Sequence, residues 1–165
     1  MSFGFLIAGF IAATNAGRIA FARESEHPSK RAVAIALLVG AVLVVVLTLV
    51  ATDLLDALSI SPESFRIAAG VVLLLTGARW LVWPRTAPGP FTAALITPGL
   101  AVLALSFGAD EPTGKVLGAA AITLPILALA ATTRIRVPTA LVTQVLAALQ
   151  IVVAVALAIS GMREV

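Results

Sequence analysis

The sequence predicts an all-α membrane protein with six transmembrane helices, and three observations predict this class. Hydrophobic residues make up 61% and charged residues 12% of the 165 residues, whereas soluble domains are about half apolar and a quarter charged. The apolar residues form six stretches that approach the ~20 residues needed to cross a bilayer as a helix. Seven of the nine prolines lie at or between the ends of these stretches. With a mean hydropathy of +1.12, a water-soluble or disordered chain of this length is excluded.

The composition offers little for metal or covalent chemistry. The chain has no cysteine, no tyrosine and one histidine, which excludes disulfides, thiolate metal sites and a cysteine nucleophile. We therefore expect no enzyme, metal centre or cofactor. Asp53 and Asp56 lie one helical turn apart and could hold a cation, but we interpret them as solvated acids at a helix end. A net charge of +3 is too small for a nucleic-acid surface, so we interpret the basic residues as topology signals and expect no nucleic-acid partner.

The first half of the chain contains three predicted spans. The first, Phe3 to Ala22, is preceded by no Lys or Arg, so we interpret it as a membrane helix and not as a signal peptide. The second, Ala32 to Thr52, carries no charge. The third, Phe65 to Trp83, follows Ser61-Pro62-Glu63, which predicts a helix start with serine as the N-cap and proline at the first position.

The second half contains three more predicted spans. The fourth, Phe91 to Phe107, is short and contains Pro98, and the fifth, Val116 to Thr132, is short and contains Pro125. The sixth, Pro138 to Gly161, is the longest. Because these spans mirror the number in the first half, the chain divides evenly.

A segment rich in proline and glycine, Ala87 to Pro90, cannot continue a helix and divides the chain near its middle. Neither half contains a polar block large enough for a soluble domain. We therefore predict a single membrane domain, residues 1–165, with a first repeat of 1–85 and a second of 90–165. In the sixth span, we expect Gln144 and Gln150 to form hydrogen bonds between helices.

The distribution of Lys and Arg predicts the orientation of the chain. One side of the membrane holds the loops that follow the odd-numbered spans, and it carries more basic residues than the side that holds both termini. Since basic residues are enriched in cytoplasmic loops, we expect a multi-pass protein of the cytoplasmic (inner) membrane with both termini outside. Trp80 and Trp83 would then form an interfacial aromatic belt on the cytoplasmic side. The side that holds the loops after the odd-numbered spans carries Arg23, Lys30, Arg31, Arg79, Arg85, Arg134 and Arg136. The side that holds both termini carries Arg66, Lys115 and Arg163.

Two spans are interrupted at matching places. The first is broken at Asn15-Ala16-Gly17-Arg18 and the fourth at Thr97-Pro98-Gly99. The two glycines are 99 − 17 = 82 residues apart, about half the length of the chain. Because each half has three spans, the halves enter the membrane in opposite directions. We therefore predict two inverted three-helix repeats with interrupted first and fourth helices.

The two breaks form the candidate substrate-binding site. Backbone groups freed by a break cannot face lipid, and the N-terminus of a half-helix suits an anion or a carbonyl. Ordinary kinks absorbed by neighbouring helices are the alternative. For Arg18 three roles are open: snorkelling to the interface, attraction of an anionic substrate, or an internal ion pair. The candidate residues are Asn15, Gly17, Arg18, Thr97, Pro98 and Gly99.

Three segments carry a family resemblance: TNAGRIAF at Thr14–Phe21, FRIAAG within Ile60–Leu81, and ITPGL at Ile96–Leu100. They resemble the MarC family of six-span inner-membrane proteins, within the LysE-type transporter superfamily. The first is similar to Asn-Pro-x-Gly followed by Ile-Pro and an aromatic residue, with Ala16 and Ala20 where the family has proline. The second resembles Phe-Arg-Ile-Ala-Gly-Gly, and the third resembles Gly-Pro-Gly with threonine in place of the first glycine. The resemblance implies two inverted repeats, and loosely implies transport.

Two functions follow as expectations. The first is a small secondary transporter or exporter of unknown substrate, with its site at the two breaks. The alternative is a non-catalytic membrane subunit of a larger complex. In either case the expected partners are the lipid bilayer and a second copy of the chain, as a homodimer, or a larger membrane complex.

Overall fold

The structure is a computed structural model, and it describes residues 1–26, 28–83, 97–132 and 138–164. Within these residues the chain is helical and contains no strand. The helices are α1 (Phe3–Thr14), α2 (Ala16–Glu26), α3 (Lys30–Ala57), α4 (Pro62–Val82), α6 (Pro98–Asp110), α7 (Thr113–Thr132) and α8 (Thr139–Glu164). The predicted divider at Ala87–Pro90, the fourth span from Phe91 to Ile96, and Arg85, Arg134 and Arg136 lie outside the described residues.

Four helical stretches are long and apolar enough to cross a membrane: Phe3–Ala22, Lys30–Ala57, Pro62–Val82 and Thr139–Arg163. Pro98–Asp110 and Thr113–Leu129 are shorter apolar helices. Several helices can therefore span a bilayer, as expected of a multi-pass membrane protein. Pro125 lies inside α7 without ending it.

Hydroxyl side chains begin most of these helices. Ser61 is the N-cap of α4, with Pro62 in the first turn, which confirms the predicted helix start. Ser2 and Ser29 cap α1 and α3 in the same way. Each of these oxygens accepts a hydrogen bond from a first-turn backbone N–H that has no partner inside the helix.

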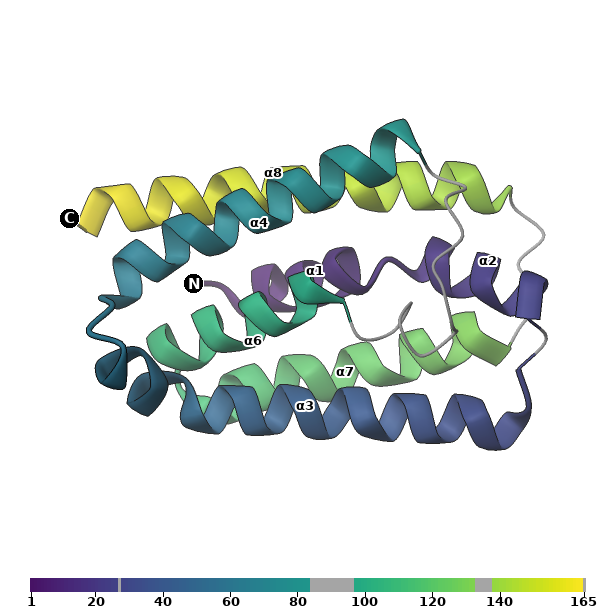
Figure 1. Cartoon of the computed structure of the whole chain (residues 1–165), viewed down its shortest axis with the longest axis horizontal. Helices are drawn as coiled ribbons and strands as arrows, with labels where there is room; N and C mark the ends of the chain where they lie inside the picture. The colour runs from purple at the N-terminus through teal and green to yellow at the C-terminus, as the bar shows by residue number, and fades with distance from the viewer. Residues whose placement is uncertain (27, 84–96, 133–137, 165) are drawn as a thin grey trace.

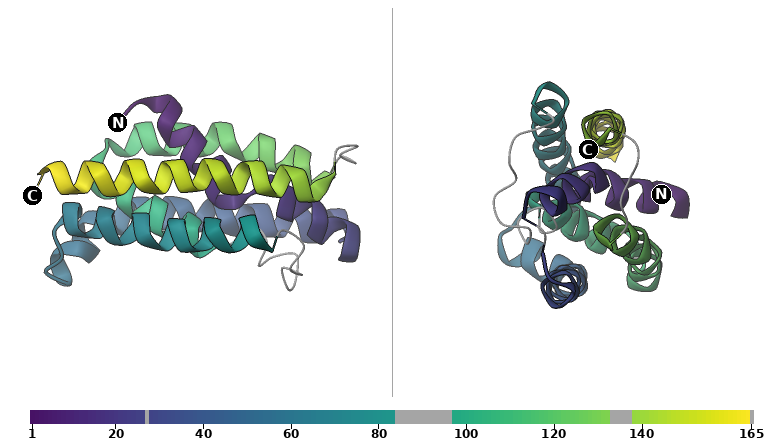
Figure 2. Two further views of the ribbon diagram at one scale, coloured as in Figure 1. Left: turned by 90° about the horizontal axis from the view of Figure 1, so that it is seen from above. Right: turned by 90° about the vertical axis from the view of Figure 1, so that its right-hand side faces the viewer.

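The interrupted first helix runs through the middle of the bundle (Figures 1 and 2). The stretch Phe3–Ala22 is 67% buried, against 28% for Lys30–Ala57. Helix α1 packs against α6, α7 and α8, and α2 packs against α7 and α8. Phe107 of α6 makes edge-to-face contacts with Phe5 and Phe10 of α1, at centroid distances of 6.2 and 5.7 Å.

Helices α4 and α8 lie side by side along most of their length (Figure 1). Glycines make this close approach possible. A Cβ atom at Gly70 would lie 2.7 Å from the Ala154 carbonyl oxygen, and one at Gly161 would lie 2.8 Å from the Glu63 carbonyl oxygen. Small residues at a helix interface allow such backbone contact, which stabilises helix pairs in lipid.

Candidate functional site at the two helix breaks

The break in the first helix is confined to one residue. Asn15 adopts a left-handed conformation, with φ 49° and ψ 84°, which asparagine tolerates better than most residues. Ala16, Gly17 and Arg18 belong to the regular helix α2. The predicted interruption is therefore present, but it is shorter than the segment Asn15–Arg18, and it forms without a proline.

The Asn15 side chain is fully buried and ties the break to α8. Its amide nitrogen Nδ2 donates a hydrogen bond to the Thr143 carbonyl oxygen at 3.0 Å. Gly17 faces the same residue, because a Cβ atom there would lie 2.5 Å from the Thr143 backbone nitrogen. Both residues thus bring the start of α2 into backbone contact with α8.

The predicted second interruption falls at the start of α6, and the residues before Thr97 lie outside the described part of the chain. Thr97 caps this helix: its Oγ1 accepts a hydrogen bond from the Leu100 N–H at 3.1 Å, and Pro98 lies in the first turn. Proline suits this position because its missing N–H would have no helical partner. The same Thr97 hydroxyl donates a hydrogen bond to the Ala13 carbonyl oxygen at 2.8 Å. Ala13 lies two residues before Asn15, so this bond joins the two breaks.

Gly99 also lies at this junction. A Cβ atom there would be 3.6 Å from the Cβ of Ala13, 3.1 Å from Cδ2 of Leu73 and 3.7 Å from Nε2 of Gln150. The structure therefore brings Thr97 and Gly99 together with the end of α1. Asn15 and Gly17, at the first break, contact Thr143 of α8 instead.

Arg18 points elsewhere. The central carbon of its guanidinium group lies 4.5 Å from the centre of the Trp80 ring on α4, a cation–π contact. Trp80 is only 4% exposed, whereas Trp83 is 61% exposed. Trp80 was expected in an interfacial belt. It is instead buried, and the Arg18 guanidinium group lies over its ring.

Hydrogen bonds from two glutamines confirm the predicted links between helices. Gln150 is fully buried, and its Nε2 donates to the Leu73 carbonyl oxygen of α4 at 3.0 Å. Gln144 donates to the Leu81 carbonyl oxygen at 3.3 Å. Both bonds join α8 to α4, and the one from Gln150 lies next to Gly99.

Two buried acceptor atoms near the breaks have no donor among the described residues. They are Oδ1 of Asn15 and Oε1 of Gln150. A buried amide oxygen without a donor costs free energy, so these two oxygens are unsatisfied hydrogen-bond acceptors near the junction.

The sequence interpretation missed one strong interaction. Arg66 and Asp110 form a two-pronged ion pair: Nε lies 2.8 Å from Oδ2, and Nη2 lies 2.7 Å from Oδ1. Both side chains are less than 10% exposed. This pair ties the start of α4 to the end of α6. From the sequence, Arg66 was interpreted only as a topology signal, and Asp110 was given no role. The only further signal for Arg66 in the sequence was its position in the segment FRIAAG.

A second charged cluster lies next to this pair, between α6 and α7. Glu111 contacts Lys115 at 2.6 Å and also the Met1 ammonium. Burial raises the pKa of Glu111, but hydrogen bonds and charges from Lys115 and the ammonium outweigh it, so the pKa lies below its ordinary value. The described residues contain no group of three or more His, Asp or Glu side chains able to hold a metal ion.

These features describe a helical protein with several helices able to cross a membrane, in which the end of α1, next to the break at Asn15, is bonded to the start of α6. Comparisons with protein-family models, with curated proteins and with solved structures find no match to the chain.

Proposed function

We propose that the chain is a small secondary transporter or exporter of the cytoplasmic membrane, with its substrate site at the two helix breaks. The observation that carries this proposal is the 2.8 Å hydrogen bond from Thr97 to the Ala13 carbonyl oxygen, which joins two residues that are 84 positions apart in the chain, one at each predicted break. Interrupted helices that meet inside a membrane protein are the usual setting of a transport site. The free oxygens of Asn15 and Gln150 would accept hydrogen bonds from a polar substrate.

The packing of the helices supports an inverted repeat. We take α1 with α2 as the first helix of one half, followed by α3 and α4, and α6, α7 and α8 as their counterparts. The first helix of each half packs on the third of the other: α1 and α2 on α8, and α6 on α4. The second helix of each half likewise packs on the first helix of the other half: α3 packs on α6, and α7 packs on α1. A packing pattern that survives exchange of the halves is what a pseudo-two-fold axis produces.

The resemblance to the MarC family fits this arrangement. Its three motifs fall at the first break, at the start of α4 and at the start of α6. Orientation with both termini outside rests on the uneven distribution of Lys and Arg. Within this proposal Arg18, stacked on Trp80, lies at the cytoplasmic end of the site.

A single-cysteine accessibility experiment tests the proposal, because the chain has no cysteine of its own. Ala13→Cys places a thiol at the junction of the breaks. Ala69→Cys is the matched control, since it is an equally buried alanine within α4. In a transporter, a small membrane-impermeant thiol reagent should label Ala13→Cys from both faces of the membrane. It should leave Ala69→Cys unlabelled. Protection of Ala13→Cys from both faces, or equal labelling of the two variants, would contradict a transport site here.

A second candidate is the non-catalytic subunit of a larger membrane complex. It is favoured by the closure of the junction: Thr97, Asn15 and Gln150 each donate a hydrogen bond to a helix backbone. Purification of the tagged chain in mild detergent, followed by native mass spectrometry, separates the two. A stoichiometric partner chain supports a subunit, whereas a monomer or homodimer supports the transporter.

A further inference from the structure

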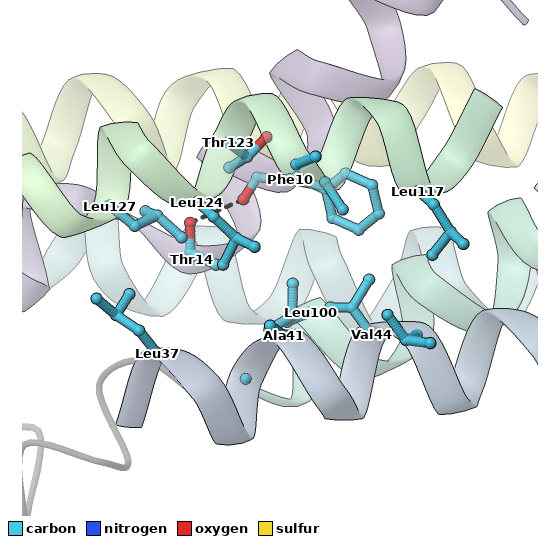
Figure 3. Close-up of a pocket in the computed structure, with 14 residues that line it drawn as sticks. Phe10, Thr14, Leu37, Ala41, Val44, Leu100, Leu117, Thr123, Leu124 and Leu127 are labelled. Carbon is cyan, nitrogen blue, oxygen red and sulfur yellow. Dashed lines mark hydrogen bonds between the residues drawn. The ribbon is translucent and has the colours of Figure 1, made fainter. Parts of the chain in front are cut away.

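A groove opens between α3 and α7, and Phe10 and Thr14 of α1 and Leu100 of α6 also line it, beside the two predicted breaks (Figure 3). Its volume is about 150 Å³, enough in other proteins for an apolar guest of roughly six carbon atoms. Leu37, Ala41 and Val44 form one wall, and α7 forms the other through residues such as Leu124. On the α3 side the groove is open beside Gly40, because no atom lies within 4 Å of a Cβ atom added there.

The side chains that line the groove leave no hydrogen-bonding group free for a ligand. Its two hydroxyl groups are bonded to their own helices: Thr14 donates to the Phe10 carbonyl oxygen at 2.8 Å, and Thr123 donates to the Ala119 carbonyl oxygen at 2.9 Å. The remaining lining residues are apolar. A guest that fills the groove gains only dispersion and the loss of an empty cavity, so hydrocarbon is the chemistry that fits.

The groove is continuous with the surface of α3 that faces lipid. Val45 lines the groove and is also 39% exposed. Next to it, Leu38 and Val42 are exposed at 64% and 52%. Gly40 lies ten residues from the start of α3, about 15 Å along the helix and hence at hydrocarbon depth. Acyl chains therefore surround the opening.

Two basic residues stand above the groove at the start of α3. Lys30 and Arg31 are both exposed, and neither forms an ion pair with a described acidic side chain. Lys30 precedes Leu37 by seven residues, which is two helical turns on the same face, or about 10 Å. A phosphate at the level of Lys30 would thus have its acyl chain at the level of the groove.

We propose that this groove, together with Lys30 and Arg31, is a binding site for one anionic phospholipid of the bilayer. A segment of one acyl chain, about six carbon atoms long, lies between α3 and α7, and the phosphate pairs with the two basic side chains. The site requires only that the chain lies in a membrane, so it stands independently of transport.

The test uses the full chain in vesicles of phosphatidylglycerol or phosphatidylcholine with identical acyl chains, each carrying a photoactivatable diazirine on the chain. Crosslinks of phosphatidylglycerol should concentrate on α3 and α7 around Gly40. Gly40→Leu, which fills the groove, should reduce them at least tenfold. Gly114→Leu is the control, because its Cβ also meets open space but lies outside the groove. Ala120→Leu fills the opposite wall and replaces Gly40→Leu if that variant does not fold.

The head-group half is tested separately. Each basic residue near an anionic surface is worth about fivefold in affinity, so the neutral variants Lys30→Gln and Arg31→Gln should each reduce the preference for phosphatidylglycerol about fivefold in native mass spectrometry. Crosslinks spread evenly over the lipid-facing helices and unchanged by the filling variants would overturn the proposal. So would equal retention of the two phospholipids by the unaltered chain, or retention of a free fatty acid in their place.

Discussion

Within the close contact of α4 with α8, Gly70 is the glycine whose added methyl group would lie nearest to a backbone atom of the other helix. The added Cβ of Gly70→Ala would lie 2.7 Å from the Ala154 carbonyl oxygen and 3.1 Å from the Ala158 Cβ. The oxygen is a backbone atom in the middle of a helix, so it cannot rotate away. The two helices must separate by several tenths of an ångström, and the contacts along their whole length loosen.

The magnitude follows from two opposing effects. Replacing glycine by alanine inside a helix stabilises the fold by about 0.5–1 kcal/mol, whereas overpacking a tight contact costs about 1–3 kcal/mol. Gly70→Ala should therefore lower the free energy of unfolding by roughly 1–2 kcal/mol. Gly40→Ala is the matched control in the middle of α3, where nothing lies within 4 Å. It should raise that free energy by about 0.5–1 kcal/mol.

Unfolding by sodium dodecyl sulfate in mixed micelles, followed by helical circular dichroism, measures both variants against the unaltered chain. The difference between them, about 2 kcal/mol, is more reliable than either value because micelle effects cancel. If Gly70→Ala were as stable as Gly40→Ala, the helices would not approach as closely as described, and the reasoning would be refuted.

Three further predictions concern the junction and the charged pairs. Thr97→Val should destabilise the fold by about 1–2 kcal/mol, since it removes the helix cap and the bond between the breaks, whereas Thr97→Ser should be nearly neutral; chemical unfolding checks this. Arg66→Met or Asp110→Leu alone should lower the free energy of unfolding by about 3–5 kcal/mol, because each change leaves one buried charge of the pair behind. The double variant should recover most of this loss, and its failure to do so would contradict the pairing. Glu111 has a lowered pKa in the folded state, so its contribution is complete above the unfolded value of about 4.3 and is lost as the pH falls through the lower, folded pKa. Lys115→Met should weaken this acid dependence in unfolding measured from pH 6 downward, and an unchanged profile would count against the pairing.

Much of the fold could be predicted because it depends on local patterns. Apolar stretches of membrane length predicted the helices, and Ser61-Pro62-Glu63 predicted the start of α4. The break at Asn15 was also visible, since asparagine and glycine interrupt an otherwise apolar run. The length of the break could not be predicted. A single left-handed residue forms it because the Asn15 side chain bonds the Thr143 carbonyl oxygen, and that partner is 128 residues away in the sequence.

The sequence by itself determined that the chain is helical, that its helices are apolar enough to cross a membrane, and where the first of them is interrupted, because these properties follow from local composition and from backbone preferences. Only the tertiary structure decided which groups meet: that Thr97 bonds Ala13, that Arg18 stacks on Trp80, and that Arg66 pairs with Asp110. The rotation and depth of each helix decide such contacts, and these depend on how all the helices pack together.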